Sequence, residues 1–187
     1  VDTIHKLHTA PVLTRRQHSL GDELEILRRM LDDTSSAEPE FAERIDALMS
    51  GCQKVADTIG SASVCGVHRD FYQYHLIRSR RKLYLVDLDL YSVGDPALDL
   101  GNFLAHVMEL SLRTAGHPNR FEELQRAMHR HVRRLYGGKT AKRVEPFTVL
   151  SLARHVALSR KFADRYHTTA ALFDICDAKL GHLLAAP

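Results

Sequence analysis

Cysteine is scarce in this chain of 187 residues, which contains only three. Cys52, Cys65 and Cys176 are odd in number and far apart, so they indicate neither a disulfide framework nor a cysteine-pair metal site. Reduced thiols are typical of the cytoplasm, and the first residues carry no signal-peptide pattern. We therefore expect a cytoplasmic protein.

Long apolar runs and a strong charge of either sign are missing as well. No run approaches the roughly 18–20 residues of a membrane-spanning helix, so we expect no membrane partner. The formal net charge is only +3, and basic residues gather in just two places, at Arg78–Lys82 and within residues 126–143. We interpret both as solvated surface, and expect no nucleic-acid partner.

The composition that is present suits one globular domain. Hydrophobic residues make up 44% and charged residues 26% of the chain, which are ordinary values for such a domain. A chain of this length buries a substantial core, and we find no internal repeat. We therefore expect residues 1–187 to form a single domain.

Most of the chain has the apolar spacing of helices. We predict a short helix that ends before Pro11, and further helices over about 21–31, 39–58, 97–113, 119–136, 145–166 and 168–184. Short β-like runs occur at Ser63–Val67, Leu76–Ile77 and Leu83–Val86, and a basic turn joins the last two. The predicted fold class is mainly α with a small β-hairpin (α+β), and the polar motifs lie in the hairpin region, about residues 63–90.

Two carboxylates in or beside this region are the candidate functional groups. Asp70 ends the loop Val67-His68-Arg69-Asp70. Asp87 directly follows the apolar run Leu83–Val86. Acids at the two ends of a hairpin lie near each other in space, and loops held by short strands are both exposed and rigid. We therefore expect Asp70 and Asp87 to face one shared site.

Such a pair suits phosphoryl transfer. That reaction needs a group that orients the attacking hydroxyl and accepts its proton, and oxygen ligands that hold a divalent cation against the phosphates. Asp70 fits the first role, and Asp87 fits the second because magnesium prefers hard oxygen ligands. Asp89, two residues further on, would share a face with Asp87 if the strand continued.

These motifs resemble those of the aminoglycoside phosphotransferase and choline kinase-like family, relatives of the protein kinases. The resemblance rests on His68-Arg69-Asp70 as the catalytic loop, on Val86-Asp87, and on Gly94-Asp95-Pro96 followed by Asp99-Leu100. The opening Ile4–Pro11 is also similar to the family's leucine-histidine-proline segment. The resemblance implies the C-terminal lobe of a kinase-like fold.

The same resemblance implies a role for each motif residue. Asp70 would be the catalytic base and Asp87 a ligand of Mg²⁺, with ATP as phosphoryl donor and a small-molecule hydroxyl compound as acceptor. Support of the catalytic loop would come from His68, Arg69, Asp95 and Asp99. Five residues after Asp70 the family commonly has an asparagine as second metal ligand, but this chain has His75. Neutral imidazole suits zinc and other transition metals better than magnesium.

The lobe that clamps the nucleotide in such proteins has no counterpart in these 187 residues. No Gly-x-Gly-x-x-Gly occurs, and no strand-borne lysine precedes the catalytic loop. We therefore expect this chain by itself to bind ATP weakly or not at all, which puts its activity as a fragment in question. The surface that would meet the missing lobe should be partly apolar, and would favour a homo-oligomer or a partner that supplies that lobe.

Two other functions remain open at this point. One is a non-catalytic remnant that binds a ligand or partner through the same site, which the missing lobe and His75 favour. The other is a metal-dependent hydrolase with His68, Asp70, His75 and Asp87 around a transition metal. The hydrolase leaves Gly94-Asp95-Pro96 without a purpose.

The residues do not identify the substrate. Phe71, Tyr72 and Tyr74 either line a substrate site or pack in the core. Sugar, amino alcohol and antibiotic hydroxyls would all meet the same aspartate, so the substrate-binding residues stay unknown. A later helix carries several cationic residues that we expect to form a solvated face rather than an anion site, namely Arg154, His155, Arg160 and Lys161.

Overall fold

Helix α4 (Pro96–Ala115) runs through the middle of the molecule in this computed structural model, which describes residues 1–185. Asp95 caps its N-terminus by accepting a hydrogen bond from the Ala97 N–H at 2.9 Å, and Pro96 occupies the first turn, where no N–H is needed. Gly116 ends the helix with a left-handed φ of 73°. Most of α4 is buried, so other elements pack on it from several sides.

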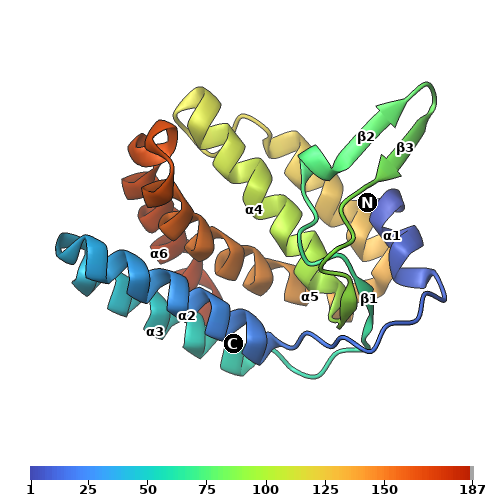
Figure 1. Cartoon of the computed structure of the whole chain (residues 1–187), viewed down its shortest axis with the longest axis horizontal. Coiled ribbons are helices and arrows are strands. Elements are labelled where there is room, and N and C mark those ends of the chain that lie inside the picture. Colours follow the sequence, from blue (N-terminus) through green and yellow to red (C-terminus); the bar gives the residue numbers. More distant parts are fainter. Residues whose placement is uncertain (186–187) are drawn as a thin grey trace.

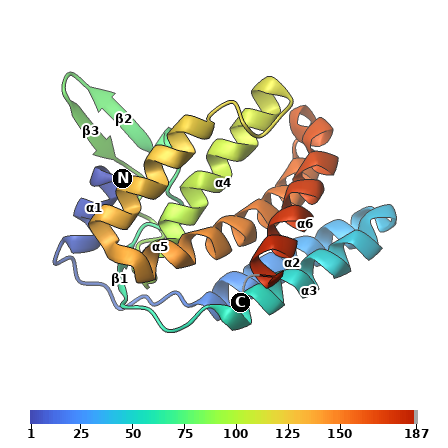
Figure 2. The same cartoon turned by 180° about the vertical axis from the view of Figure 1, so that it is seen from behind.

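Helix α5 (Glu122–Lys161) packs along α4 and then changes direction, as Figure 2 shows. The bend lies at Gly137, whose φ of 77° and ψ of 176° interrupt the helix. After the bend the two helices approach closely at Gly101. A Cβ atom at that position would lie 2.7 Å from the Cβ of Phe147 and from the backbone nitrogen of Thr148. Only glycine therefore allows this packing distance.

Three further helices pack around the second half of α5 (Figure 1): α2 (Leu20–Ala37), α3 (Ala42–Thr58) and α6 (Thr169–Ala185). A 3₁₀ turn precedes α3 at Pro39–Phe41, and another precedes α6 at Ala163–Thr168. Their apolar faces form one core with α4 and α5. Fully buried members of this core include Leu31, Leu48, Leu100, Leu104, Leu152, Leu172 and Phe173. Within residues 1–185 no helix is long and apolar enough to cross a membrane.

The strands lie near the N-terminal end of α4, next to α1 (Asp2–Thr9). Strand β1 (Cys65–Val67) pairs antiparallel with β4 (Ser92–Gly94), and the linker before α2 adds a bridge from Gln17 to Val93. The hairpin of β2 (Leu76–Ser79) and β3 (Lys82–Leu85) projects from the molecule. A short 3₁₀ turn, Gln73–His75, lies between the Val67–Asp70 loop and β2.

The predicted fold class is confirmed, whereas several element boundaries differ. The helix predicted over 21–31 continues to Ala37, because Thr34 bonds back to the Met30 carbonyl and the Glu38 N–H bonds to Thr34. Gly137 reorients α5 instead of ending it, and the helix predicted to reach 166 ends at Lys161. Strand β4 was not predicted because three residues carry too little alternation to be recognised.

Candidate active site

The loop Val67–Asp70, which the family resemblance identifies as the catalytic loop, has its backbone held by Asp99. Asp99 lies in the first turn of α4 and is completely buried. Its two carboxylate oxygens accept hydrogen bonds from the backbone N–H groups of His68 and Arg69, each at 2.7 Å. Arg69 has a φ of 72°, a left-handed conformation that is unfavourable for a residue with a side chain. The two hydrogen bonds stabilise this conformation and so fix the backbone from which Asp70 extends.

A second layer of hydrogen bonds braces Asp99 itself. The His8 Nε2 donates to Asp99 at 2.8 Å, and the Tyr136 hydroxyl donates to His8 Nδ1 at 2.8 Å. Burial raises the pKa of Tyr136, so the phenol keeps its proton. This series of hydrogen bonds connects α1 and α5 to the Val67–Asp70 loop. His8 lies within the opening segment that resembles the family, but nothing in the sequence pointed to Tyr136.

His68 connects the catalytic loop to the segment that carries Asp87. Its side chain is fully buried, with Nε2 donating to the Val86 carbonyl at 2.9 Å and Nδ1 accepting from the Asp70 N–H at 3.3 Å. Both ring nitrogens are therefore engaged with the backbone and neither is free to bind a metal. The four-residue metal set of the hydrolase hypothesis is not formed.

Asp70 and Asp87 lie on either side of one imidazole ring, that of His75. The His75 Nδ1 donates to the Asp70 carbonyl at 2.7 Å and lies 3.8 Å from the Asp70 Oδ2. The His75 Nε2 lies 3.3 Å from the Asp87 Oδ2. The side chains of Asp70 and Asp87 are 44% and 52% exposed, so both carboxylates are open to solvent at a shared site.

This arrangement fits Mg²⁺ better than a transition metal. Magnesium usually binds through one or two carboxylates, with waters and substrate phosphates completing its shell. Asp87 offers such an oxygen, and Asp70 lies on the other side of His75 from it. A zinc site needs three or four protein ligands, and no group of three or more His, Cys, Asp or Glu residues in the described part of the chain is arranged to hold a metal.

Asp89 does not share the face of Asp87. Strand β3 ends at Leu85, and Asp87 has a left-handed φ of 63°, so the alternation of a strand does not continue. Asp89 lies in the turn beyond, where its backbone carbonyl accepts a hydrogen bond from Arg16. Asp95, besides capping α4, forms a two-point ion pair with Arg143 of α5, at 2.8 and 3.1 Å.

The predicted solvated face at Arg154 and His155 is wrong. His155 is 2% exposed, and Arg154 is half-buried, donating to Asn102 Oδ1 at 2.7 Å and pairing with the buried Glu23. Asn102 in turn donates to the Phe71 carbonyl at 3.2 Å, next to Asp70. Helical spacing alone does not reveal this, because the partner Glu23 lies on a helix distant in sequence.

The charge of Glu23 is stabilised within that network. Burial raises the pKa of Glu23, but a hydrogen bond from His18 and the charge of Arg154 outweigh it and hold the pKa below its usual value. The ion pair therefore stays formed at neutral pH and keeps Asn102 in position behind the catalytic loop. Arg160, also predicted to be solvated, instead pairs with Glu38.

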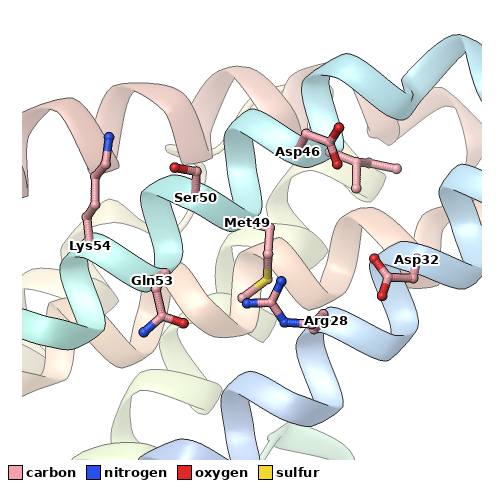
Figure 3. Close-up of a pocket in the computed structure, with 8 residues that line it drawn as sticks. Arg28, Asp32, Asp46, Met49, Ser50, Gln53 and Lys54 are labelled. Carbon is pink, nitrogen blue, oxygen red and sulfur yellow. The ribbon is translucent and has the colours of Figure 1, made fainter.

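The hollow between α2 and α3, drawn in Figure 3, is unrelated to these carboxylates. Its volume is about 380 Å³, and none of its lining residues belongs to the catalytic loop or to the Asp87 segment. Arg28 and Lys54 face it together with Asp32 and Asp46, so opposite charges balance there. Nothing in this lining selects a particular ligand.

Comparison with known proteins gives one matching family and several similar solved structures. The model of a family described as "Phosphotransferase enzyme family" matches residues 1–138. No curated protein matches the sequence. Among solved structures, a choline/ethanolamine kinase family protein from Mesorhizobium loti aligns at 15% identity with a TM-score of 0.58, over 98% of this chain and 59% of that one.

Two further solved structures give the same result. Choline kinase from Cryptosporidium parvum Iowa II aligns at 15% identity with a TM-score of 0.61, over 97% of this chain and 63% of that one. An ethanolamine kinase from Plasmodium vivax aligns at 13% identity with a TM-score of 0.58, over 94% and 58%. At such identities the likeness concerns the kinase-like fold, and this chain spans about three fifths of those proteins' length.

Proposed function

The chain belongs to the phosphotransferase enzyme family, and from that membership we propose that it transfers a phosphoryl group from a nucleotide to a hydroxyl of a small molecule. The observation that carries the proposal is the convergence of Asp70 and Asp87 on His75, with Asp70 extending from a loop that Asp99 holds rigidly. Positioning of this kind is most of what phosphoryl transfer asks of a protein.

Each carboxylate has one role in this proposal. Asp70 orients the acceptor hydroxyl and takes its proton as the oxygen bonds to the terminal phosphorus of ATP. The bond from that phosphorus to the bridging oxygen breaks, and a nucleoside diphosphate leaves. Asp87 would hold Mg²⁺, which would neutralise charge on the phosphates. His75 lies between the two acids, where the family resemblance places a second metal ligand.

We propose further that residues 1–187 correspond to one C-terminal kinase-like lobe, and that groups outside these residues clamp the nucleotide. The span of about three fifths of the solved neighbours supports this view. Exposed apolar side chains on and near the hairpin are available for such a contact, namely Ile77, Leu83, Tyr84, Leu88 and Leu90.

The test is transfer of labelled phosphate from ATP with Mg²⁺ to a panel of small hydroxyl compounds. Choline and ethanolamine, after which the structural neighbours are named, belong in the panel beside glycerol and glycerate. The assay is run on these 187 residues and on the protein as its gene encodes it. We expect Asp70→Asn to lower the rate of transfer about 10²- to 10⁴-fold, because the proton acceptor is lost.

Asp33→Asn is the matched control, since Asp33 is an exposed carboxylate on α2, outside the site. It should leave the rate unchanged. Transfer that survives Asp70→Asn at the unmodified rate would show that Asp70 is not the base. A full-length protein that binds a panel compound but never transfers phosphate to it would instead favour the non-catalytic alternative.

A further inference from the structure

Helix α1 and strand β3 lie side by side (Figure 1) and form the two walls of a groove. Thr3 and Lys6 line the groove from α1, where residues three positions apart share one face of the helix. The hairpin supplies the other wall, namely Arg81, Lys82, Leu83 and Tyr84. The groove has a volume of about 390 Å³, which is the size of a small-molecule site.

A second cavity, of about 600 Å³, adjoins this groove at the tip of the hairpin. The two cavities share Arg81, Lys82 and Tyr84, and the second is also lined by Ser79 and Arg80. Ser79 pairs with Lys82, so Arg80 and Arg81 form the two-residue turn between the strands. The sequence indicated this basic stretch to be solvated surface, whereas the structure places it along a continuous hollow that α1 helps to form.

This α1–hairpin groove carries positive charge that no acid of its lining balances. The cationic side chains that line the two cavities are Lys6, Arg80, Arg81 and Lys82. No aspartate or glutamate lines either cavity, and the lysine and arginine ion pairs within residues 1–185 involve none of these four cations. Asp2, the acid of α1, is bonded to His131 at 2.9 Å. Like charges gathered around one hollow repel one another, so a bound anion would relieve that repulsion.

The turn itself holds one of these cations in an unfavourable conformation. Arg80 has a φ of 53°, in the left-handed region where two-residue hairpin turns favour glycine, asparagine or aspartate. Glycine at this position would relax the backbone, but it would remove a charge from the tip. A strained residue at an exposed tip therefore indicates that the side chain of Arg80 has a use beyond the fold.

We propose that the α1–hairpin groove binds a small molecule that carries two or more phosphate groups. Arginine binds phosphate oxygens at two points and lysine binds them as a point charge. Each phosphate monoester brings about 1.5–2 negative charges, whereas a carboxylate brings one, so two phosphates match the four cations within this volume. Neither Asp70 nor Asp87 lines the groove, so this site is separate from the carboxylates of the proposed transfer reaction.

The test is calorimetric titration of the 187-residue chain with three probes that share one sugar: fructose 1,6-bisphosphate, fructose 6-phosphate and fructose. The buffer contains EDTA and no nucleotide, so no divalent cation can hold a phosphate at Asp87. We expect saturable binding of one bisphosphate per chain, at least about tenfold weaker binding of the monophosphate, and no binding of fructose.

Two variants remove a cation from opposite walls of the groove. Arg80→Gly gives the turn a residue that it favours, so it should weaken bisphosphate binding about tenfold while the melting temperature stays the same or rises. Lys6→Gln should weaken binding about fivefold or more, because the charge on the α1 wall is lost. Lys54→Gln is the matched control, since Lys54 is an exposed lysine on another helix, α3, and should leave binding unchanged.

The proposal is overturned if the bisphosphate does not bind, if the monophosphate binds as tightly, or if Arg80→Gly and Lys6→Gln both bind normally. Polyglutamate that binds more tightly than the bisphosphate and displaces it would overturn it in favour of an acidic peptide. Association with vesicles that contain a phosphoinositide bisphosphate, without binding of the soluble bisphosphate, would overturn it in favour of a membrane surface.

Asp70→Asn separates this proposal from the phosphotransferase function. We expect it to leave bisphosphate binding unchanged, because Asp70 does not line the groove. Binding that is lost in Asp70→Asn would place the bisphosphate at the carboxylates and contradict the groove. Binding that depends on Arg80 and Lys6, in a protein that never transfers phosphate, would support the groove and contradict the phosphotransferase function.

Discussion

Asp99 accepts three hydrogen bonds on its two carboxylate oxygens, from the backbone of His68 and Arg69 and from His8. In asparagine one of these oxygens is replaced by an NH₂ group. That group would face a buried N–H donor and cannot accept its hydrogen bond. We therefore expect Asp99→Asn to lower the free energy of unfolding by about 3 kcal/mol, measured by urea denaturation. It should also lower any phosphoryl transfer, because the Arg69 backbone is released.

The exposed Asp33 again provides the comparison. Asp33→Asn removes the same charge from a carboxylate that faces solvent, and should change stability by less than about 0.5 kcal/mol. Equal stabilities of the Asp99→Asn and Asp33→Asn variants would mean that the backbone of the loop keeps its left-handed turn without the carboxylate.

At the scale of single residues, the sequence predicted the convergence of Asp70 and Asp87 because a hairpin is a local structure. Two acids at the ends of a short antiparallel ribbon lie close together whatever packs around them. Their buried partners were not predictable in this way. His8, Tyr136 and Arg154 act through contacts between residues more than 50 positions apart, which no local pattern encodes.

Helices α4 and α5 depend on Gly101 for their close approach. A Cβ at this position would lie 2.7 Å from the Phe147 Cβ and from the Thr148 backbone nitrogen of the facing helix. Neither atom can move away by a side-chain rotation. We expect Gly101→Ala to lower the free energy of unfolding by about 1–3 kcal/mol, despite alanine's better helix propensity. Thermal or urea denaturation measures the change.

Gly181 in α6 separates the effect of helix propensity from that of a steric clash, because a Cβ there would meet nothing within 4 Å. Gly181→Ala gains helix propensity without a clash, and should raise stability by up to about 1 kcal/mol. If both substitutions stabilise the protein, the α4–α5 contact accommodates a methyl group and does not depend on glycine.

At the scale of elements, the apolar periodicity predicts the long helices. It does not predict that α2 extends to Ala37 or that α5 continues past Gly137. The helix through Ser35-Ser36-Ala37 overrides a sequence typical of a turn, because Thr34 is buried and bonded within it. Gly137-Gly138 reads as a helix end, yet Gly137 alone leaves the helical conformation and the chain resumes a helix in a new direction. Helix α2 packs on α3 and α5, and α5 packs on α4. Such packing between helices is not visible in a local window of sequence.

For the molecule as a whole, the buried histidines make stability depend on pH. In the folded chain, burial and the charges of Arg154 and Arg165 lower the pKa of His106 to about 3, and lower that of His155 as well. In the unfolded chain both return to about 6.5. As the pH falls below that value the unfolded state binds protons first, so these residues destabilise the fold progressively until the folded pKa is reached.

We expect the free energy of unfolding of the wild-type chain to fall between pH 7.5 and pH 5, with a contribution on the order of 1–2 kcal/mol from each of the two histidines. His155→Gln removes one titrating group from the core and should make the pH profile shallower, even if the variant is less stable at pH 7.5. His182→Gln, which removes an exposed histidine of α6, should leave the slope unchanged. Parallel profiles for the wild type and His155→Gln would mean that water reaches the ring, and that His155 takes up its proton in the folded chain as readily as in the unfolded one.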